Sequence, residues 1–119
     1  MTTQETLEQY FEAIHAGGWE DFIADDFTFV NNNLDNIMYG KEAYLKGPGQ
    51  FFRSTTGVEV KQQFIDGDQA AVLARYVLRS PKGSTGYCDV AEFITVHDDK
   101  LTASTIIFDR KAFSEFMQS

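Results

Sequence analysis

The chain has 119 residues, 43% of them hydrophobic and 24% charged, which suits one soluble globular domain and leaves too little chain for a second core. The formal net charge of −8 argues against a nucleic-acid partner, because a polyphosphate would be repelled. A single cysteine, Cys88, excludes an internal disulfide and is typical of a cytoplasmic protein. No apolar run is long enough to span a membrane and the N-terminus is polar, so we expect no membrane association.

The first predicted element is a helix in "TTQETLEQYFEAIHAGG", residues 2–18. Thr2 and Glu5 have the spacing of a capping box, and Gly17 with Gly18 supplies a helix end. Apolar side chains recur at helical spacing, so that one helix face should be buried: Leu7, Tyr10, Phe11 and Ile14.

Two shorter elements follow this helix. The segment "WEDFIADD", residues 19–26, predicts a second short helix. The segment "FTFVNN", residues 27–32, alternates as a strand does, which places Phe27, Phe29 and Asn31 on one face.

The segment "GKEAYLKGPGQFFRST", residues 40–55, predicts a helix that is interrupted near Pro48. From residue 57 onward the pattern is that of strands joined by short turns, namely 57–65, 69–79, 85–96 and 101–109. A last short helix over 110–118 follows Asp109, which is placed to cap it. Helices followed by an antiparallel meander indicate an α+β fold, in a single domain over residues 1–119.

The predicted strand 85–96 is apolar on both faces. One face carries Tyr87, Asp89, Ala91 and Phe93, and the other carries Cys88, Val90, Ile94 and Val96. An antiparallel sheet with one wet face would alternate more cleanly, so both faces should be covered. The helices can cover one of them, and a second copy of the chain is the simplest cover for the other. We therefore expect a homodimer through that second face, with the alternative that the C-terminal helix folds back over it and leaves the protein monomeric.

Three segments of the chain carry a family resemblance: "LEQYFEAIHAGGWEDF" (7–22), "DDFTFVNN" (25–32) and "VAEFITVHDDKLTASTIIFD" (90–109). Taken in this order, they resemble the NTF2-like superfamily, which includes SnoaL-like polyketide cyclases and ketosteroid isomerases. The resemblance implies a cone, in which a long N-terminal helix packs in a strongly curved antiparallel sheet that encloses a pocket. The homodimer contact would then lie on the convex face of this sheet.

The resemblance also implies catalytic positions, and this chain departs from the pattern at several of them. The general base of isomerase-like members aligns with Asn31, whose amide can bond a ligand but has no useful proton affinity. The tyrosine donor aligns with Tyr10, and its partner acid, which is protonated and buried in the family, with Ala91. The acid of the SnoaL-like cyclases aligns with Ile106.

Three residues remain as catalytic candidates: Tyr10 as hydrogen-bond donor, Asn31 as orienting amide and Asp89 as the base. If Asp89 shares the inner face with Ala91 and Phe93, burial would raise its pKa. The alternative, which we favour because acids are rarely fully buried, is an ionised residue at the wet mouth of the cone. The expected ligand-binding residues, for which core packing is the alternative, are Trp19, Phe29, Tyr44, Phe52, Tyr76, Tyr87, Phe93, Ile106 and Phe108.

Two functions stay open. The first is an enzyme that isomerises, cyclises or dehydrates a hydrophobic cyclic or polyketide-like small molecule without a cofactor. The second is a binding or dimerisation module that keeps the cone and has lost catalysis, as the replaced acids suggest. His15 and His97 lie far apart and no cluster has ligand spacing, so we expect no metal site.

Overall fold

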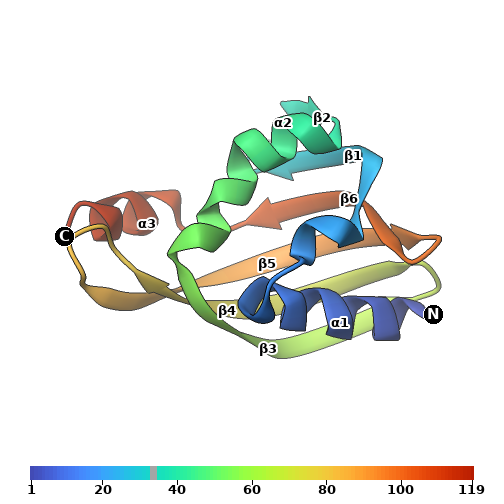
Figure 1. The fold of residues 1–119 in the computed structure, drawn as a ribbon, viewed down its shortest axis with the longest axis horizontal. Helices are drawn as coiled ribbons and strands as arrows, with labels where there is room; N and C mark the ends of the chain where they lie inside the picture. Colours follow the sequence, from blue (N-terminus) through green and yellow to red (C-terminus); the bar gives the residue numbers. More distant parts are fainter. Residues whose placement is uncertain (33–34) are drawn as a thin grey trace.

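The structure, a computed structural model, describes residues 1–32 and 35–119. A curved six-stranded sheet forms the body of the molecule, with α1 lying across one of its faces (Figure 1). The elements run along the chain as α1 (Thr3–Ala16), η1 (Trp19–Phe22), β1 (Ile23–Asn31), β2 (Ile37–Tyr39), α2 (Lys41–Lys46), η2 (Pro48–Ser54), β3 (Thr55–Asp66), β4 (Gln69–Arg79), β5 (Thr85–His97), β6 (Lys100–Ile107) and α3 (Arg110–Met117).

The predicted α+β class and the meander are confirmed, because β3 to β6 pair antiparallel with their neighbours in the chain. The strand order is β2-β1-β6-β5-β4-β3, so the first strand lies beside the last one and pairs with it in parallel. Neither this parallel pair nor the short strand β2 was predicted, because both depend on which distant segments meet.

The ends of the helices follow the predicted local signals. The Thr2 side chain accepts from the Glu5 N–H and the Glu5 side chain accepts from the Thr2 N–H, which completes the capping box of α1. Asp109 caps α3 by accepting from the Ala112 N–H at 2.9 Å. The helix predicted over 19–26 is wrong in its second half, because only Trp19–Phe22 is helical and β1 begins at Ile23.

The predicted assignment of the two faces of β5 is reversed. Cys88, Val90, Ile94 and Val96 are buried in the core against the helices. Tyr87 and Phe93 lie on the opposite, convex face with 62% and 52% of their surfaces exposed. The residues that we expected to form a dimer contact are therefore core residues. The alternation was predicted correctly, but its direction depends on the partner strand and the covering helix.

The register with β4 shows why the face with Cys88, Val90 and Ile94 turns inward. The even-numbered residues from Gly86 to Ile94 stand opposite uncharged residues of β4, namely Ala70, Val72, Ala74, Tyr76 and Leu78. The other rows pair Arg75 with Asp89 and place Arg79 opposite Thr85. Burying those rows would bury charges, which is far more expensive than burying apolar side chains.

No helix among the described residues is both long and apolar enough to cross a membrane.

Candidate functional site

The site is built on one row of residues that crosses three strands of the sheet. Asn31 of β1 stands opposite Ile106 of β6, and Ile106 stands opposite Glu92 of β5. Residues paired in this way point to the same side, here the side that faces the helices. Two strand spacings separate the backbones of Asn31 and Glu92 by roughly 10 Å, which leaves room for one small ring between their side chains.

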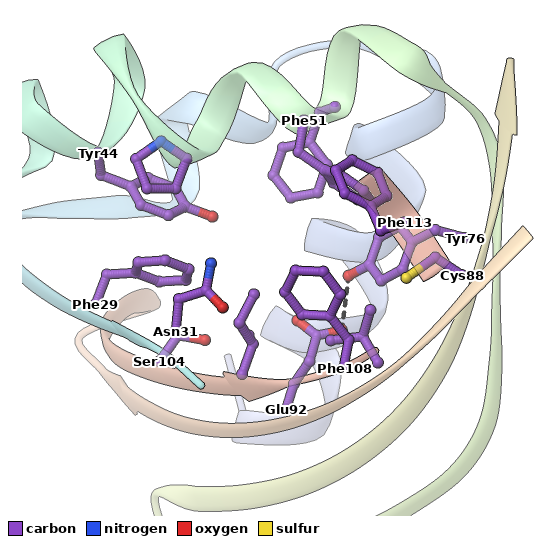
Figure 2. Close-up of a pocket in the computed structure, with 14 residues that line it drawn as sticks. Phe29, Asn31, Tyr44, Phe51, Tyr76, Cys88, Glu92, Ser104, Phe108 and Phe113 are labelled. Carbon is purple, nitrogen blue, oxygen red and sulfur yellow. Dashed lines mark hydrogen bonds between the residues drawn. The ribbon is translucent and has the colours of Figure 1, made fainter. Parts of the chain in front are cut away.

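A cavity of about 190 Å³ lies over this row, between the sheet and the segments α2, η2 and α3. Figure 2 shows Asn31, Tyr44 and Glu92 around the same open space. The wall is mostly aromatic and aliphatic, and consists of Phe29, Asn31, Tyr44, Pro48, Phe51, Phe52, Tyr76, Cys88, Val90, Glu92, Ser104, Ile106, Phe108 and Phe113.

Glu92 is the buried acid of this cavity, with 5% of its surface exposed. Its Oε2 accepts a hydrogen bond of 2.6 Å from the Tyr76 hydroxyl (Figure 2). Burial raises the pKa of Glu92 to about 7, and the hydrogen bond from Tyr76 opposes part of that rise. An acid with a pKa near neutrality can both take up and return a proton.

Hydroxyl and amide groups stand across the cavity from Glu92. Asn31 points its amide nitrogen towards the Tyr44 hydroxyl (Figure 2), and its Oδ1 is buried with no partner among residues 1–32 and 35–119. Burial raises the pKa of Tyr44, while a hydrogen bond from Tyr10 opposes this. Burial likewise raises the pKa of Tyr10. Tyr10 does not line the cavity, although its hydroxyl is close enough to that of Tyr44 to affect its pKa; Tyr44 itself is a lining residue.

Two segments close the cavity with phenylalanine rings. The 3₁₀ helix η2 brings Phe51 and Phe52 over it, and it can lie this close only because residue 49 is glycine. A Cβ on Gly49 would come within 2.9 Å of both the Trp19 ring and the Tyr44 carbonyl oxygen. On the other side, the Asn32 side chain bonds the backbone N–H and C=O of Phe108 and so holds this wall residue in place.

The electrostatics of the cavity favour an uncharged ligand. No lysine, arginine or histidine is among the described residues that line it. A ligand carboxylate or phosphate would meet the Glu92 side chain without a compensating cation, and burying an unpaired charge is strongly unfavourable.

The structure brings together most of the predicted ligand-binding residues. Those that line the cavity are Phe29, Tyr44, Phe52, Tyr76, Ile106 and Phe108, together with Asn31. Trp19 is buried but stands outside the cavity, behind Tyr44 and Phe52, with ring centroids 6.2 and 4.6 Å away. Tyr87 and Phe93 were predicted to face the cavity, and this placement is wrong because they lie on the convex face.

The predicted placement of Asp89 in the cavity is also wrong. Asp89 lies on the convex face and forms two hydrogen bonds with the Arg75 guanidinium, of 2.8 and 3.0 Å. The hydrogen bond from Arg75 lowers the pKa of Asp89, the opposite of the change expected for an Asp89 buried in the cavity. Arg75 also lies over the Tyr87 ring, 3.9 Å from its centroid. Asp89 is therefore an ionised surface residue that cannot reach the cavity.

Glu92 was not among the predicted site residues, although the sequence carries a signal for it. Glu92 shares its strand face with Cys88, Val90, Ile94 and Val96, and an acid within an otherwise apolar alternation indicates a buried and functional carboxyl group. Ala91, the position that the resemblance implied for the family's buried acid, belongs to the convex row with Leu73 and Ile107 and does not face the cavity.

The described part of the chain holds no group of three or more histidine, cysteine or acidic side chains that could bind a metal ion. His15 and His97 are both exposed. The Cys88 thiol lines the cavity, and burial raises its pKa to about 11, which leaves it protonated and unreactive at neutral pH.

Comparison with known proteins identifies the architecture. A sequence model of the SnoaL-like domain matches residues 7–104. No curated protein matches the chain in sequence.

Three solved structures illustrate the likeness in fold. A candidate SnoaL-like polyketide cyclase from Jannaschia sp. CCS1 superposes with a TM-score of 0.80 at 17% identity, over 98% of this chain and 92% of that one. TerC, co-crystallised with polyporic acid, superposes with a TM-score of 0.77 at 20% identity, over 98% of each chain. A candidate ketosteroid isomerase from Kribbella flavida DSM 17836 superposes with a TM-score of 0.70 at 17% identity, over 91% of this chain and 78% of that one. At these identities the likeness shows the shared fold.

Proposed function

This chain belongs to the SnoaL-like domain family, and on that premise we propose that it binds a small hydrophobic cyclic molecule in the Glu92 cavity and moves a proton on it without a cofactor. The observation that carries the proposal is a buried glutamate, with a pKa near 7, in an aromatic cavity that also presents an amide and a tyrosine hydroxyl. Isomerisation, cyclisation and dehydration all need a group that takes a proton at one atom and returns it at another.

The volume of the cavity limits the size of the ligand. The cone is partly filled by its own aromatic side chains, and the remaining 190 Å³ is smaller than a typical drug-sized pocket. A dry cavity of about 150 Å³ is large enough to bind benzene. A compound with one ring, or with two small fused rings, therefore fits better than an extended polyketide.

A non-catalytic binding module is the second candidate function. It is favoured by Asn31 and Ile106, which stand where the family resemblance implies acids, and by the small size of the cavity. The two candidates share a ligand cavity and differ in whether Glu92 exchanges a proton with the ligand.

The test compares two variants on the same strand, Glu92→Gln and Asp89→Asn. Binding of 2-cyclohexenone is measured by ligand-observed NMR, and conversion of 3-cyclohexenone to its conjugated isomer is followed by ultraviolet absorbance. We expect Glu92→Gln to bind the ring and to lose about a hundredfold or more in turnover, whereas Asp89→Asn keeps both properties. Wild-type binding without turnover would support the module, and no binding of any ring compound would contradict both candidates.

We also propose that the protein is a cytoplasmic homodimer through the convex face of the sheet. Support comes from apolar side chains exposed in neighbouring rows of this face: Phe64, Leu73, Val77, Tyr87, Phe93 and Ile107. An apolar patch of this kind on one face is typical of a protein–protein contact. A two-fold axis through the sheet would let the same patch cover itself.

A further inference from the structure

We infer that the proton acceptor and the carbonyl-binding end of this site have exchanged positions relative to the ketosteroid isomerase pattern. Glu92 on β5 takes the proton, and Asn31 on β1 together with Tyr44 holds the carbonyl oxygen of a neutral single-ring ketone. The inference rests on the proposed function, to which it adds the substrate class and the orientation of the substrate.

The chemistry of the two side chains distinguishes their roles. The resemblance places the base at the position of Asn31, but an amide side chain does not accept a proton at neutral pH. Its N–H group can donate a hydrogen bond to a carbonyl or enolate oxygen. Glu92 is the only carboxyl group among the described residues that line the cavity, so it is the only base available there.

The geometry places these two groups at opposite ends of one small ligand. Both side chains arise from the row in which Ile106 lies between them, roughly 10 Å apart at the backbone. Glu92 is held from one side by the Tyr76 hydroxyl at 2.6 Å, which orients the carboxylate while one oxygen stays available. The Asn31 amide nitrogen points towards the Tyr44 hydroxyl, and both lie across the open space from Glu92 (Figure 2).

Two donors form the carbonyl end. The Asn31 amide and the Tyr44 hydroxyl both belong to residues that line the cavity, so the Asn31 N–H and the Tyr44 O–H can meet an oxygen on which negative charge develops. Preorganised donors of this kind are the usual means of stabilising an enolate.

The resulting reaction balances in atoms and charge. The Glu92 carboxylate removes a proton from the carbon between the carbonyl group and an isolated C=C bond. The electron pair moves into a dienolate, whose oxygen is held by Asn31 and Tyr44. Protonated Glu92 then returns the proton to the γ-carbon, which gives the conjugated ketone and restores the carboxylate.

The substrate class follows from the wall and the volume. No cation among the described residues that line the cavity could bind a carboxylate or phosphate group, so the substrate is neutral. A cavity of about 190 Å³ holds one ring with its substituents, and a four-ring steroid exceeds it. The wall of phenylalanine rings suits a hydrocarbon ring that carries a single carbonyl group.

The experiment tests which end of the cavity holds the base that removes the proton. Wild type, Asn31→Leu, Asn31→Asp and Glu92→Gln are assayed with 3-cyclohexenone in D₂O, where deuterium at the γ-carbon reports exchange with a protein acid. Binding of 2-cyclohexenone and a thermal melt confirm that each variant is folded. Glu92→Asp, which keeps the acid but shortens it, serves if Glu92→Gln does not fold.

We expect Asn31→Leu to lose about tenfold to a hundredfold, mainly in kcat, because a donor to the enolate is gone. Asn31→Asp should lose more than Asn31→Leu, since a carboxylate repels the enolate oxygen. Glu92→Gln should lose turnover and deuterium incorporation together, and Glu92→Asp should retain part of both. The steroid 5-androstene-3,17-dione should be converted more slowly than 3-cyclohexenone.

Opposite results would overturn the inference. A gain of turnover in Asn31→Asp would place the base on β1, as in the isomerase pattern. Faster conversion of the steroid would contradict the single-ring substrate. A wild-type protein that binds the ketone without isomerising it would also overturn the inference and would leave the binding function intact, whereas failure to bind any ring probe would remove the proposed function itself.

Discussion

The two faces of β5 carry acids that differ in every property that matters for chemistry. Glu92 faces the cavity, is buried, accepts from a tyrosine and has its pKa raised to about 7. Asp89, three residues earlier, faces outward, pairs with Arg75 and has its pKa lowered. The face of the strand on which the side chain lies, more than the residue type, decides which acid can exchange protons with a ligand.

The aromatic residues of the sheet show the same contrast. Tyr76 points inward, packs against Phe51 at a centroid distance of 5.2 Å and orients Glu92. Tyr87 points outward and lies beneath the Arg75 guanidinium. On the inner face an aromatic ring shapes a ligand site, and on the convex face it contributes to a surface that we propose for self-association.

The largest predicted difference between the faces appears in the pH dependence of folding. The folded-state pKa of Glu92 is raised from 4.5 to about 7, so folded Glu92 keeps its proton where the unfolded chain has lost it. Its contribution to stability is complete below the unfolded pKa and is lost as pH rises through about 7, a change of about 3 kcal/mol. Urea melts of wild type and Glu92→Gln should diverge over this range.

The Gln variant provides the control for this measurement, because it cannot ionise. Its unfolding free energy should lack the decline that wild type shows between about pH 4.5 and pH 7. Parallel pH profiles for the two proteins would show that Glu92 is not the buried titrating group.

The convex face offers the next largest effect. Phe93→Lys replaces a ring that is 52% exposed in the monomer with a charge in the middle of the apolar rows. If this face is the dimer contact, the dissociation constant of the dimer should rise about tenfold or more, because buried aromatic residues dominate such contacts. Sedimentation velocity measures this change. Wild type that sediments as a monomer at micromolar concentration would contradict the proposed homodimer.

The closure of the inner face by α3 can be tested at one glycine. A Cβ on Gly86 would lie 2.7 Å from the Phe116 ring, so Gly86→Ala should displace the ring and lower stability by about 1–3 kcal/mol. The double variant Gly86→Ala with Phe116→Ala removes the clash. It should therefore lose less than the sum of the two single changes, as a set of thermal melts will show.

The smallest effect is expected on the convex side of β5 itself. Asp89→Asn breaks an ion pair that is open to solvent, and such pairs contribute little to stability. Turnover of 3-cyclohexenone should change by less than about twofold, and the urea midpoint should stay within experimental error. A strong loss of turnover would mean that the outer face participates in the chemistry.

Local signals in the sequence were sufficient for several elements of the fold. The capping box of Thr2 and Glu5, the interruption of the second helix before Pro48 and the cap at Asp109 all form between residues close in the chain. The family resemblance rested on the order of such elements, and the match over residues 7–104 confirms it. Three aromatic residues of the cavity, Phe29, Tyr44 and Tyr76, were also predicted, because the periodicity of their own segments of the sequence placed them on an inner face.

The sequence by itself determined the α+β order, the meander and the alternation along each strand, because these depend on short-range periodicity. Only the tertiary structure decided that β1 lies parallel to β6, which places Asn31 in one row with Glu92. It also decided which side of β5 faces α1. Both sides of that strand are apolar enough to be buried, and the choice came from Arg75 and Arg79 on the neighbouring strand, whose charges must remain in water.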